Sequence, residues 1–141
     1  MTKREVFEFI EKNMCCTLAT CVDDKPHVRW MWMYRADEKG IVFHTGVARD
    51  VYKQLRANPN VELCFYNGDP QNMVQVRVSG IAVPEDDMKL KEEIVSNRPF
   101  LKPIVAQYGH EAIGVFRVRE MAATVWSMAS NLAPKEVIDI G

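Results

Sequence analysis

The chain has 141 residues, a formal net charge of −1 at neutral pH, and a composition that is 48% hydrophobic and 26% charged. This is enough chain for one domain with a full core, and we expect a single domain over residues 1–141. The nearly balanced charge argues against nucleic acid or an anionic membrane surface as a partner. No apolar run is long enough to cross a bilayer, and the first residues lack the apolar stretch of a secretory signal, so we expect a cytoplasmic protein.

The four cysteines, at positions 15, 16, 21 and 64, match no zinc-binding spacing, and the three histidines are scattered. Cys15 and Cys16 are adjacent, so in a strand they point to opposite faces, which suits neither a mutual disulfide nor a shared metal. We therefore expect small buried thiols in a reducing compartment and no metal site.

The chain opens with a predicted helix over residues 2–13, where apolar side chains recur at helical spacing. Thr2 and Glu5 form a capping-box pattern at its start. A first strand follows over residues 15–22, and residues 23–26 predict a hairpin turn.

The second predicted strand, over residues 27–35, has two contrasting faces. One carries Val28, Trp30, Trp32 and Tyr34, and the other carries His27, Arg29, Met31, Met33 and Arg35. We expect the aromatic face to pack in the barrel core and at a dimer contact, because aromatic side chains dominate such burial.

Residues 41–45 predict a third strand that ends in Thr45-Gly46 and runs into a helix over residues 48–57. Ala48, Val51, Tyr52 and Leu55 mark its buried stripe by their spacing. Arg49 and Lys53 lie on one side of this helix, and Arg49 is near the N-terminal end, where the helix dipole disfavours cations. A bound anion removes both penalties, so the junction is a candidate phosphate site. The alternative is a solvated helix in which Asp50 pairs with Lys53.

Further along the chain, alternation predicts a fourth strand over residues 61–65 and a long fifth strand over residues 72–83. The fifth strand presents a valine face to the core and a face with Gln75 and Arg77 to a polar site or subunit interface. An acidic helix with a solvated face is expected over residues 84–96, and a short helix over residues 99–108. The final strand spans 113–118 and resumes over 122–128. We therefore expect a mainly β fold: a six-stranded antiparallel barrel with peripheral helices.

Six short motifs occur in a fixed order: Leu18-Ala19-Thr20, Pro26-x-Val28-Arg29, Phe43-x-Thr45-Gly46, Lys53-Gln54-Leu55 with Asn58-Pro59, Val61-Glu62-Leu63-Cys64, and Val76-Arg77-Val78-x-Gly80. Together they resemble the FMN-binding split-barrel proteins related to pyridoxamine 5′-phosphate oxidase. The resemblance runs from about residue 4 to residue 138 and is strongest to the short branch that includes nitroimidazole-resistance proteins.

The resemblance implies a six-stranded split barrel that forms a homodimer with FMN bound between the subunits. It places the flavin near Arg29 and the adjoining strand, its phosphate at Thr45, Arg49 and Lys53, and its ring near Gln75 and near Trp126 of the partner subunit. The cofactor-binding residues it implies are Val28, Arg29, Trp30, Met31, His44, Thr45, Gly46, Arg49, Lys53, Gln54, Gln75 and Trp126.

Two departures from the family pattern bear on the activity. The oxidases carry Ser-Arg-Lys in the phosphate loop, whereas this chain has Arg49-Asp50-Val51 and its lysine lies two positions further on. The C-terminal arginine-and-histidine segment that binds substrate in the true oxidases is not recognisable. Both departures argue against oxidation of vitamin B6.

Some residues have two readings. His44 aligns with the reactive-site histidine of the nitroimidazole-resistance proteins and is the one catalytic candidate, but it also fits an ordinary strand histidine. Arg29 needs an anionic partner or several acceptors, which a flavin or Glu62 would supply. The aromatic face of the second strand could also stack on the flavin, and Arg77 suits an ion pair at the dimer interface.

The expected function is a flavin-dependent oxidoreductase that acts on a small planar substrate. The chain has no Gly-x-Gly-x-x-Gly motif, so a nicotinamide donor would have to meet the flavin directly. The alternative is a non-catalytic carrier or sensor that binds flavin or another cofactor.

Overall fold

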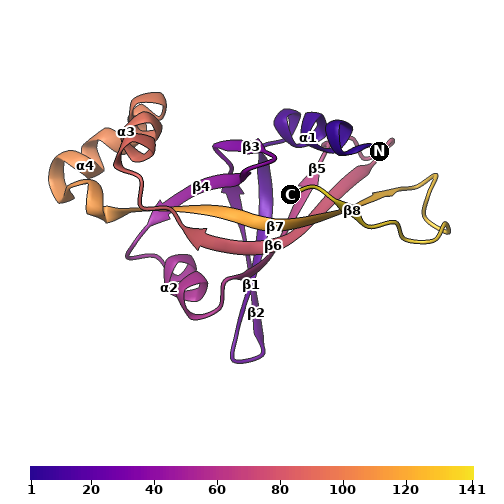
Figure 1. Cartoon of the computed structure of the whole chain (residues 1–141), viewed down its shortest axis with the longest axis horizontal. Helices are drawn as coiled ribbons and strands as arrows, with labels where there is room; N and C mark the ends of the chain where they lie inside the picture. The colour runs from indigo at the N-terminus through magenta and orange to yellow at the C-terminus, as the bar shows by residue number, and fades with distance from the viewer.

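The computed structural model describes residues 1–141 and contains an extensive antiparallel sheet with helices around it (Figure 1). In chain order, the helices and strands are α1 (Lys3–Lys12), β1 (Cys15–Val22), β2 (Lys25–Trp32), β3 (Arg35–Asp37), β4 (Gly40–Gly46), α2 (Asp50–Ala57), β5 (Asn60–Tyr66), β6 (Val74–Pro84), α3 (Met88–Asn97), α4 (Lys102–Tyr108), β7 (Ile113–Ser127) and β8 (Ile138–Asp139). Short 3₁₀ turns flank α4 at Pro99–Leu101 and His110–Ala112.

The sheet is curved but not closed by a continuous ladder. Its strand order is β2-β1-β5-β6-β7-β4-β3, with β8 added beside β7, so β2 and β3 form opposite edges although they follow each other in the chain. The chain crosses between these edges at Met33 and Tyr34. The N–H of Met33 donates to the Met14 carbonyl at 2.9 Å, and that of Tyr34 donates to Val42 at 2.8 Å. The expected split barrel is confirmed, with its opening at this crossing.

The core lies between the curved sheet and helices α1 and α2. It contains 22 buried residues, among them Val6 and Ile10 of α1 and Val51 and Leu55 of α2. The capping box of α1 is present as expected, with Thr2 accepting from Glu5. Apolar spacing therefore places both helices correctly, because each buries one stripe and exposes the rest.

The expectation that the aromatic face of β2 packs in the barrel core is wrong for this chain. Val28 and Trp30 are each 68% exposed and Trp32 is 51% exposed, whereas Met31 and Met33 are buried. Because side chains alternate along a strand, placing the methionines inside puts the large aromatic side chains on the outer surface of an edge strand. A dimer contact on this surface stays a prediction.

A second cluster of seven buried residues lies on the outer side of β4 and β7, under α3 and the following turn. Leu90, Ile94 and Val95 of α3 belong to it, so one face of this helix is buried, while its acidic residues are exposed as expected. The helix begins at Met88, with Asp87 as its N-cap, because that carboxylate accepts from the backbone N–H groups of Lys89 and Leu90. Figure 1 shows α3 and α4 together at one end of the molecule.

Two further boundaries differ from the sequence expectation. The last strand is continuous over 15 residues, with a break in its register to β6 between Ser79 and Ile81 and a positive φ of 54° at Glu120. Ala48 is exposed, because α2 starts two residues later than its apolar spacing suggests. None of the helices is both long and apolar enough to span a membrane.

Candidate functional site

The centre of the predicted cofactor site is the side chain of Arg29 on β2, which points towards β1 and α2. Its Nη1 donates to the Leu18 carbonyl at 3.2 Å and to the Thr20 hydroxyl at 2.9 Å, and its Nη2 donates to Oε1 of Gln54. The Thr20 hydroxyl in turn donates to Gln54 at 2.6 Å. Arg29 is therefore held by neutral oxygens and does not pair with Glu62, which leaves its positive charge uncompensated by these bonds.

An open cavity of about 470 Å³ lies beside this network, at the start of α2. The residues that line it are His27, Arg29, Ala48, Arg49, Asp50, Val51 and Gln54. Burial lowers the pKa of Arg29, and the positive charge of Arg49 lowers it further, while Asp50 opposes them. Two guanidinium groups thus act on each other across this cavity, with one carboxylate nearby.

The first turn of α2 adds hydrogen-bond donors to the same cavity. Arg49 occupies the N-cap position and its side chain makes no capping bond. The first N–H groups of any helix have no acceptor within the helix, and they carry the positive end of its dipole. The cavity therefore combines two cations with backbone N–H groups that lack an acceptor within the helix. This arrangement suits an anion with several oxygen atoms.

Thr45 and Gly46 close β4 just before this turn. The Thr45 side chain is buried, and its hydroxyl is the one buried side-chain oxygen or nitrogen without a hydrogen-bond partner. Such groups are uncommon in folded proteins and call for an acceptor or donor from elsewhere. The orphaned hydroxyl lies on the segment that the sequence assigns to the phosphate.

Lys53 and Gln54 occupy different environments, although the sequence places both at the cofactor. Gln54 lines the cavity and holds Arg29, whereas Lys53 is exposed and is not among the lining residues. Arg49, the N-cap residue of α2, is the cation that reaches the cavity, whereas the rotation of the helix turns Lys53 outwards.

The position of α2 depends on Gly114 of β7. A Cβ atom built at Gly114 would lie 2.9 Å from two ring carbons of Tyr52, so the absence of a side chain lets that ring lie directly against the strand. The ring also packs edge-on against Phe116, with centroids 5.8 Å apart. The contact of Tyr52 with β7 sets the distance between α2 and the sheet, and this distance determines how wide the cavity opens.

Gln75 and Trp126 form a second group, far along the sheet. They are paired residues of β6 and β7, and together with Arg77 they line a cavity of about 200 Å³. The indole N–H of Trp126 donates to Asn131 at 2.9 Å, which fixes the ring orientation. Arg77 is exposed and makes no ion pair within the chain, so its predicted interface role stays a prediction.

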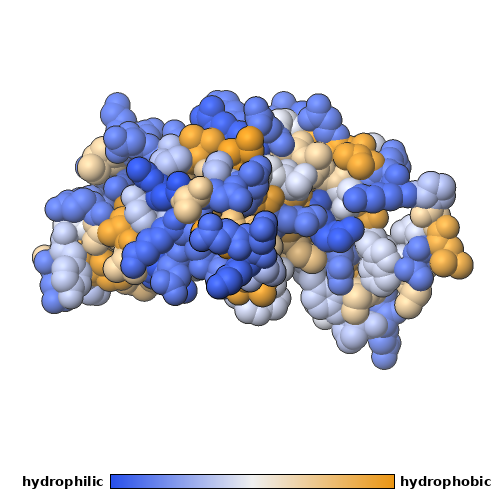
Figure 2. Space-filling view, turned by 90° about the horizontal axis from the view of Figure 1, so that it is seen from below, coloured by the Kyte–Doolittle hydropathy of each residue, from blue (hydrophilic) through white to orange (hydrophobic).

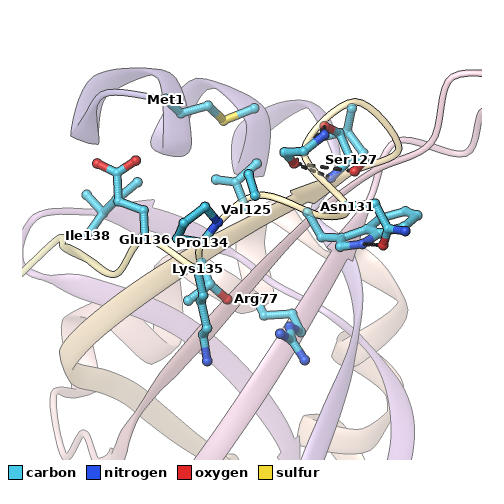
Figure 3. Close-up of a pocket in the computed structure, with 14 residues that line it drawn as sticks. Met1, Arg77, Val125, Ser127, Asn131, Pro134, Lys135, Glu136 and Ile138 are labelled. Atoms are coloured by element: carbon cyan, nitrogen blue, oxygen red, sulfur yellow. Dashed lines mark hydrogen bonds between the residues drawn. The ribbon is translucent and has the colours of Figure 1, made fainter.

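A larger cavity of about 540 Å³ adjoins this second group, between the end of β7 and the loop that follows it (Figure 3). Arg77 and Lys135 extend to the same side of it, and Glu136 and Met1 stand further round its wall. The loop also carries Met128, Leu132 and Val137, whose apolar side chains are all exposed. In the view of Figure 2, an orange patch lies at the end of the molecule where this loop projects.

The two groups share no lining residue. Of the predicted phosphate ligands Thr45, Arg49 and Lys53, Arg49 alone lines the cavity at α2, and the cavities at Trp126 hold the predicted ring contacts. One chain alone therefore does not bring all the predicted site residues together. No three His, Cys, Asp or Glu side chains are gathered where they could hold a metal ion, and the metal-free site stays a prediction.

Sequence reasoning missed Arg98, which lies at the predicted catalytic candidate His44. Arg98 is only 4% exposed, and its Nη1 lies 2.8 Å from Nε2 of His44. Burial, together with the positive charge of Arg98, lowers the pKa of His44 to about 4. An isolated arginine that ends an acidic helix gives no sequence signal of burial, because only the tertiary fold brings it to β4.

The fold is that of a split-barrel protein, with an open cavity at the junction between β4 and α2. A NimC/NimA family protein from Clostridium acetobutylicum has the same fold, with a TM-score of 0.74 and 22% identity over 96% of this chain and 90% of that one. A heme binding protein from Mycobacterium smegmatis matches with a TM-score of 0.70 and 14% identity over 97% of this chain and 57% of its own.

The family model described as "Pyridoxamine 5'-phosphate oxidase" matches residues 2–130. The chain therefore belongs to the pyridoxamine 5′-phosphate oxidase family, and the resemblance seen in the sequence is confirmed. A pyridoxine/pyridoxamine 5′-phosphate oxidase from Psychrobacter sp. (strain PRwf-1) is 29% identical over 140 residues, which is 96% of this chain and 64% of that oxidase. The chain thus spans less than two thirds of the length of this curated relative.

Proposed function

We propose that the chain is an FMN-binding homodimer that acts as a flavin-dependent oxidoreductase on a small planar substrate. The observation that carries the proposal is the convergence of Arg29, Arg49 and the first turn of α2 on one cavity. A phosphate ester is the part of FMN that such a donor set recognises, because cations and helix N–H groups both favour a doubly charged oxyanion.

The residues present fit this cofactor. Arg49 and the α2 amides would hold the phosphate, whereas the hydroxyl of Thr45 is buried and Thr45 does not line the cavity. Arg29 would be held in place by Thr20 and Gln54, so that its orientation exists before any ligand binds.

The second group of residues supports a dimer. Gln75 and Trp126 line cavities that are separate from the phosphate cavity, so the ring contacts would come from a second copy of the chain. The exposed side chains of Val28, Trp30 and Trp32 on edge strand β2 offer apolar area for that contact. Large exposed apolar patches on a protein surface usually mark an interaction site.

FMN would supply hydride or electron transfer when bound. The protein would anchor the phosphate, orient the ring against the outer aromatic side chains of β2, and exclude water at the subunit interface; Met31, which the sequence also assigned to the cofactor, lies in the core on the opposite face of the strand. His44 would remain neutral, since its pKa lies near 4, and would donate a hydrogen bond without moving a proton. Four free cysteines agree with a reducing cytoplasm as the site of action.

The second candidate is a non-catalytic binder of flavin or another cofactor. It is favoured by His44, because the one catalytic candidate is bonded to Arg98 and is a poor proton donor. It also agrees with a fold neighbour named as a heme binding protein.

The test begins with the purified protein. Flavin absorption bands, one FMN bound per chain and a dimer in analytical ultracentrifugation are expected, with riboflavin binding more weakly than FMN. A monomer that binds neither compound would refute the proposal. Flavin reduction by NADH or NADPH then separates the two candidates: turnover supports the oxidoreductase, and tight FMN binding without reduction by either donor supports the binder.

A further inference from the structure

The crossing between the two edges of the sheet, at Met33 and Tyr34, is held by a side chain from outside the sheet. Arg98 follows α3, and its guanidinium reaches the crossing: Nη1 donates to the Trp32 carbonyl at 3.1 Å and Nη2 donates to the Met33 carbonyl at 2.7 Å. The neighbouring N–H groups of Met33 and Tyr34 donate to Met14 and Val42. Backbone polar groups at this break in the ladder thus find partners, as buried groups require.

Arg98 is an unusual residue at this position, because its positively charged guanidinium is buried without a carboxylate as ion-pair partner. Its acceptors are two carbonyl oxygens and one ring nitrogen, and its guanidinium carbon lies 3.7 Å from the ring centroid of Trp32. The ring of Tyr34 lies on another side, with its centroid 5.2 Å away. Neutral acceptors and aromatic faces stabilise a buried guanidinium. Loss of any one of these partners leaves the buried charge less well compensated, which costs free energy.

The third acceptor determines the state of His44. A guanidinium has five N–H donors and no acceptor, so the Nε2 atom that lies 2.8 Å from Nη1 must present its lone pair. The single proton of the neutral ring is then on Nδ1. Nδ1 makes no hydrogen bond within the chain, and it is not among the buried atoms that lack a partner, so it is accessible.

The surroundings of the His44 ring are aromatic. The His44 ring lies 6.3 Å from the ring of Phe100, which stacks on Trp32 at 6.2 Å. Trp32 and Phe100 are both more than half exposed, at 51% and 56%. A single uncharged donor therefore stands beside a flat apolar surface.

We propose that Arg98 is a positioning residue that fixes His44 as the Nδ1–H tautomer and holds it as a neutral hydrogen-bond donor beside Trp32 and Phe100. The inference concerns the chain's own residues and does not depend on flavin binding. It defines what His44 can do for a molecule at this surface: donate one hydrogen bond of fixed direction to an acceptor atom.

The first test uses the unmodified protein. Nitrogen-15 NMR of the histidine side chains identifies which ring nitrogen is protonated, and His44→Gln assigns the His44 signals against those of His27 and His110. We expect the proton on Nδ1 and a neutral ring down to about pH 5. A proton on Nε2, or a rapidly averaged mixture of the two tautomers, would overturn the proposal.

The second test compares Arg98→Met and Arg98→Lys, with Arg4→Met as a control at an exposed position of α1. Arg98→Met should mix the His44 tautomers and raise its titration midpoint by about one pH unit or more, because the fixed donor and the positive charge are both lost. Amide exchange at Met33 and Tyr34 should become faster than in the control. Arg98→Lys keeps the charge without the planar fork, so the midpoint should stay low while the tautomers mix.

A role in stability alone gives a different pattern. Arg98→Met would then lower the melting temperature while His44 kept its tautomer and midpoint, and this result would contradict the inference. If Arg98→Met does not fold, the tautomer in the unmodified protein and the behaviour of Arg98→Lys decide the question.

Discussion

The guanidinium of Arg29 lies 2.9 Å from the hydroxyl of Thr20, on the neighbouring strand of the same hairpin. The contact is local in the sheet, but Gln54 of α2 completes it by accepting from both residues. A cation beside the proposed phosphate cavity is thus oriented before any ligand arrives.

Arg29→Met should lower the free energy of unfolding by about 1–3 kcal/mol, because Thr20 and Gln54 lose a charge-assisted partner. Chemical denaturation measures the change. The exposed Arg4→Met should shift it by no more than about 0.5 kcal/mol. Equal effects of the two substitutions would mean that the Arg29 network adds nothing to stability.

Arg49→Met should weaken FMN binding about tenfold or more and leave riboflavin binding nearly unchanged, because only FMN carries the phosphate. Lys53→Met is the matched control, since Lys53 lies on the same helix but does not line the cavity. We expect a smaller loss for Lys53→Met, through screened long-range attraction. Fluorescence titration with both flavins measures the effect. A larger loss at Lys53 would return the phosphate to the position that the sequence indicated, and equal losses of FMN and riboflavin would remove the phosphate assignment.

Gly114→Ala should lift α2 from the sheet, because its Cβ would lie 2.9 Å from the Tyr52 ring. The expected cost is about 1–3 kcal/mol, with weaker FMN binding as the cavity mouth moves. Gly46→Ala is a suitable control for stability, since the nearest atom to its Cβ is 3.6 Å away. Adding Tyr52→Ala to Gly114→Ala should relieve the clash, so the double variant should lose less stability than the sum of the two single changes.

The pH dependence of stability should contain a contribution from His44. Its pKa is lowered to about 4 in the folded chain from 6.5, so the unfolded chain takes up the proton first as the pH falls. Above pH 6.5 the contribution is fully present, and it is lost as the pH drops from there towards 4. The slope is about 1.4 kcal/mol per pH unit within this window. Urea denaturation of the unmodified protein and of His44→Gln isolates this contribution. The difference between their free energies of unfolding should shrink on acidification. A difference that is independent of pH would show that His44 titrates alike in both states.

The division of the site between two chains can be tested by mixing variants. Arg49→Met removes a residue proposed to bind the phosphate, and Trp126→Ala removes a residue proposed to contact the ring. Each variant alone should therefore bind FMN poorly. After subunit exchange, about half of the dimers are hybrids with one intact site each, and about a quarter of all sites should be restored. Equilibrium dialysis with FMN counts them. No gain on mixing would place both halves of a site on the same chain.

Local patterns were sufficient for the long strands, the capped first helix and the family, but not for the short strands β3 and β8. The cap at Thr2 and the alternation of side chains along β5 and β6 involve only residues that are close in the sequence. The six ordered motifs are likewise recognised without any knowledge of distant contacts. The phosphate junction stays a prediction: it was inferred from Arg49, Lys53 and the start of a helix, and of the two cations Arg49 alone lines the cavity.

The tertiary structure decided which side chains face the core and which face the cavities. Whether Trp30 or Met31 enters the core depends on which side of β2 the rest of the sheet covers, and alternation alone does not choose. Whether Lys53 or Gln54 reaches the cavity depends on the rotation of α2, which is set by the contact of Tyr52 with Gly114. Arg98 reaches His44 across 54 positions of the chain, a distance over which sequence spacing carries no geometric information. The sequence by itself determined the elements and the family, whereas the orientation of the site residues arose from packing between segments that are remote in the chain.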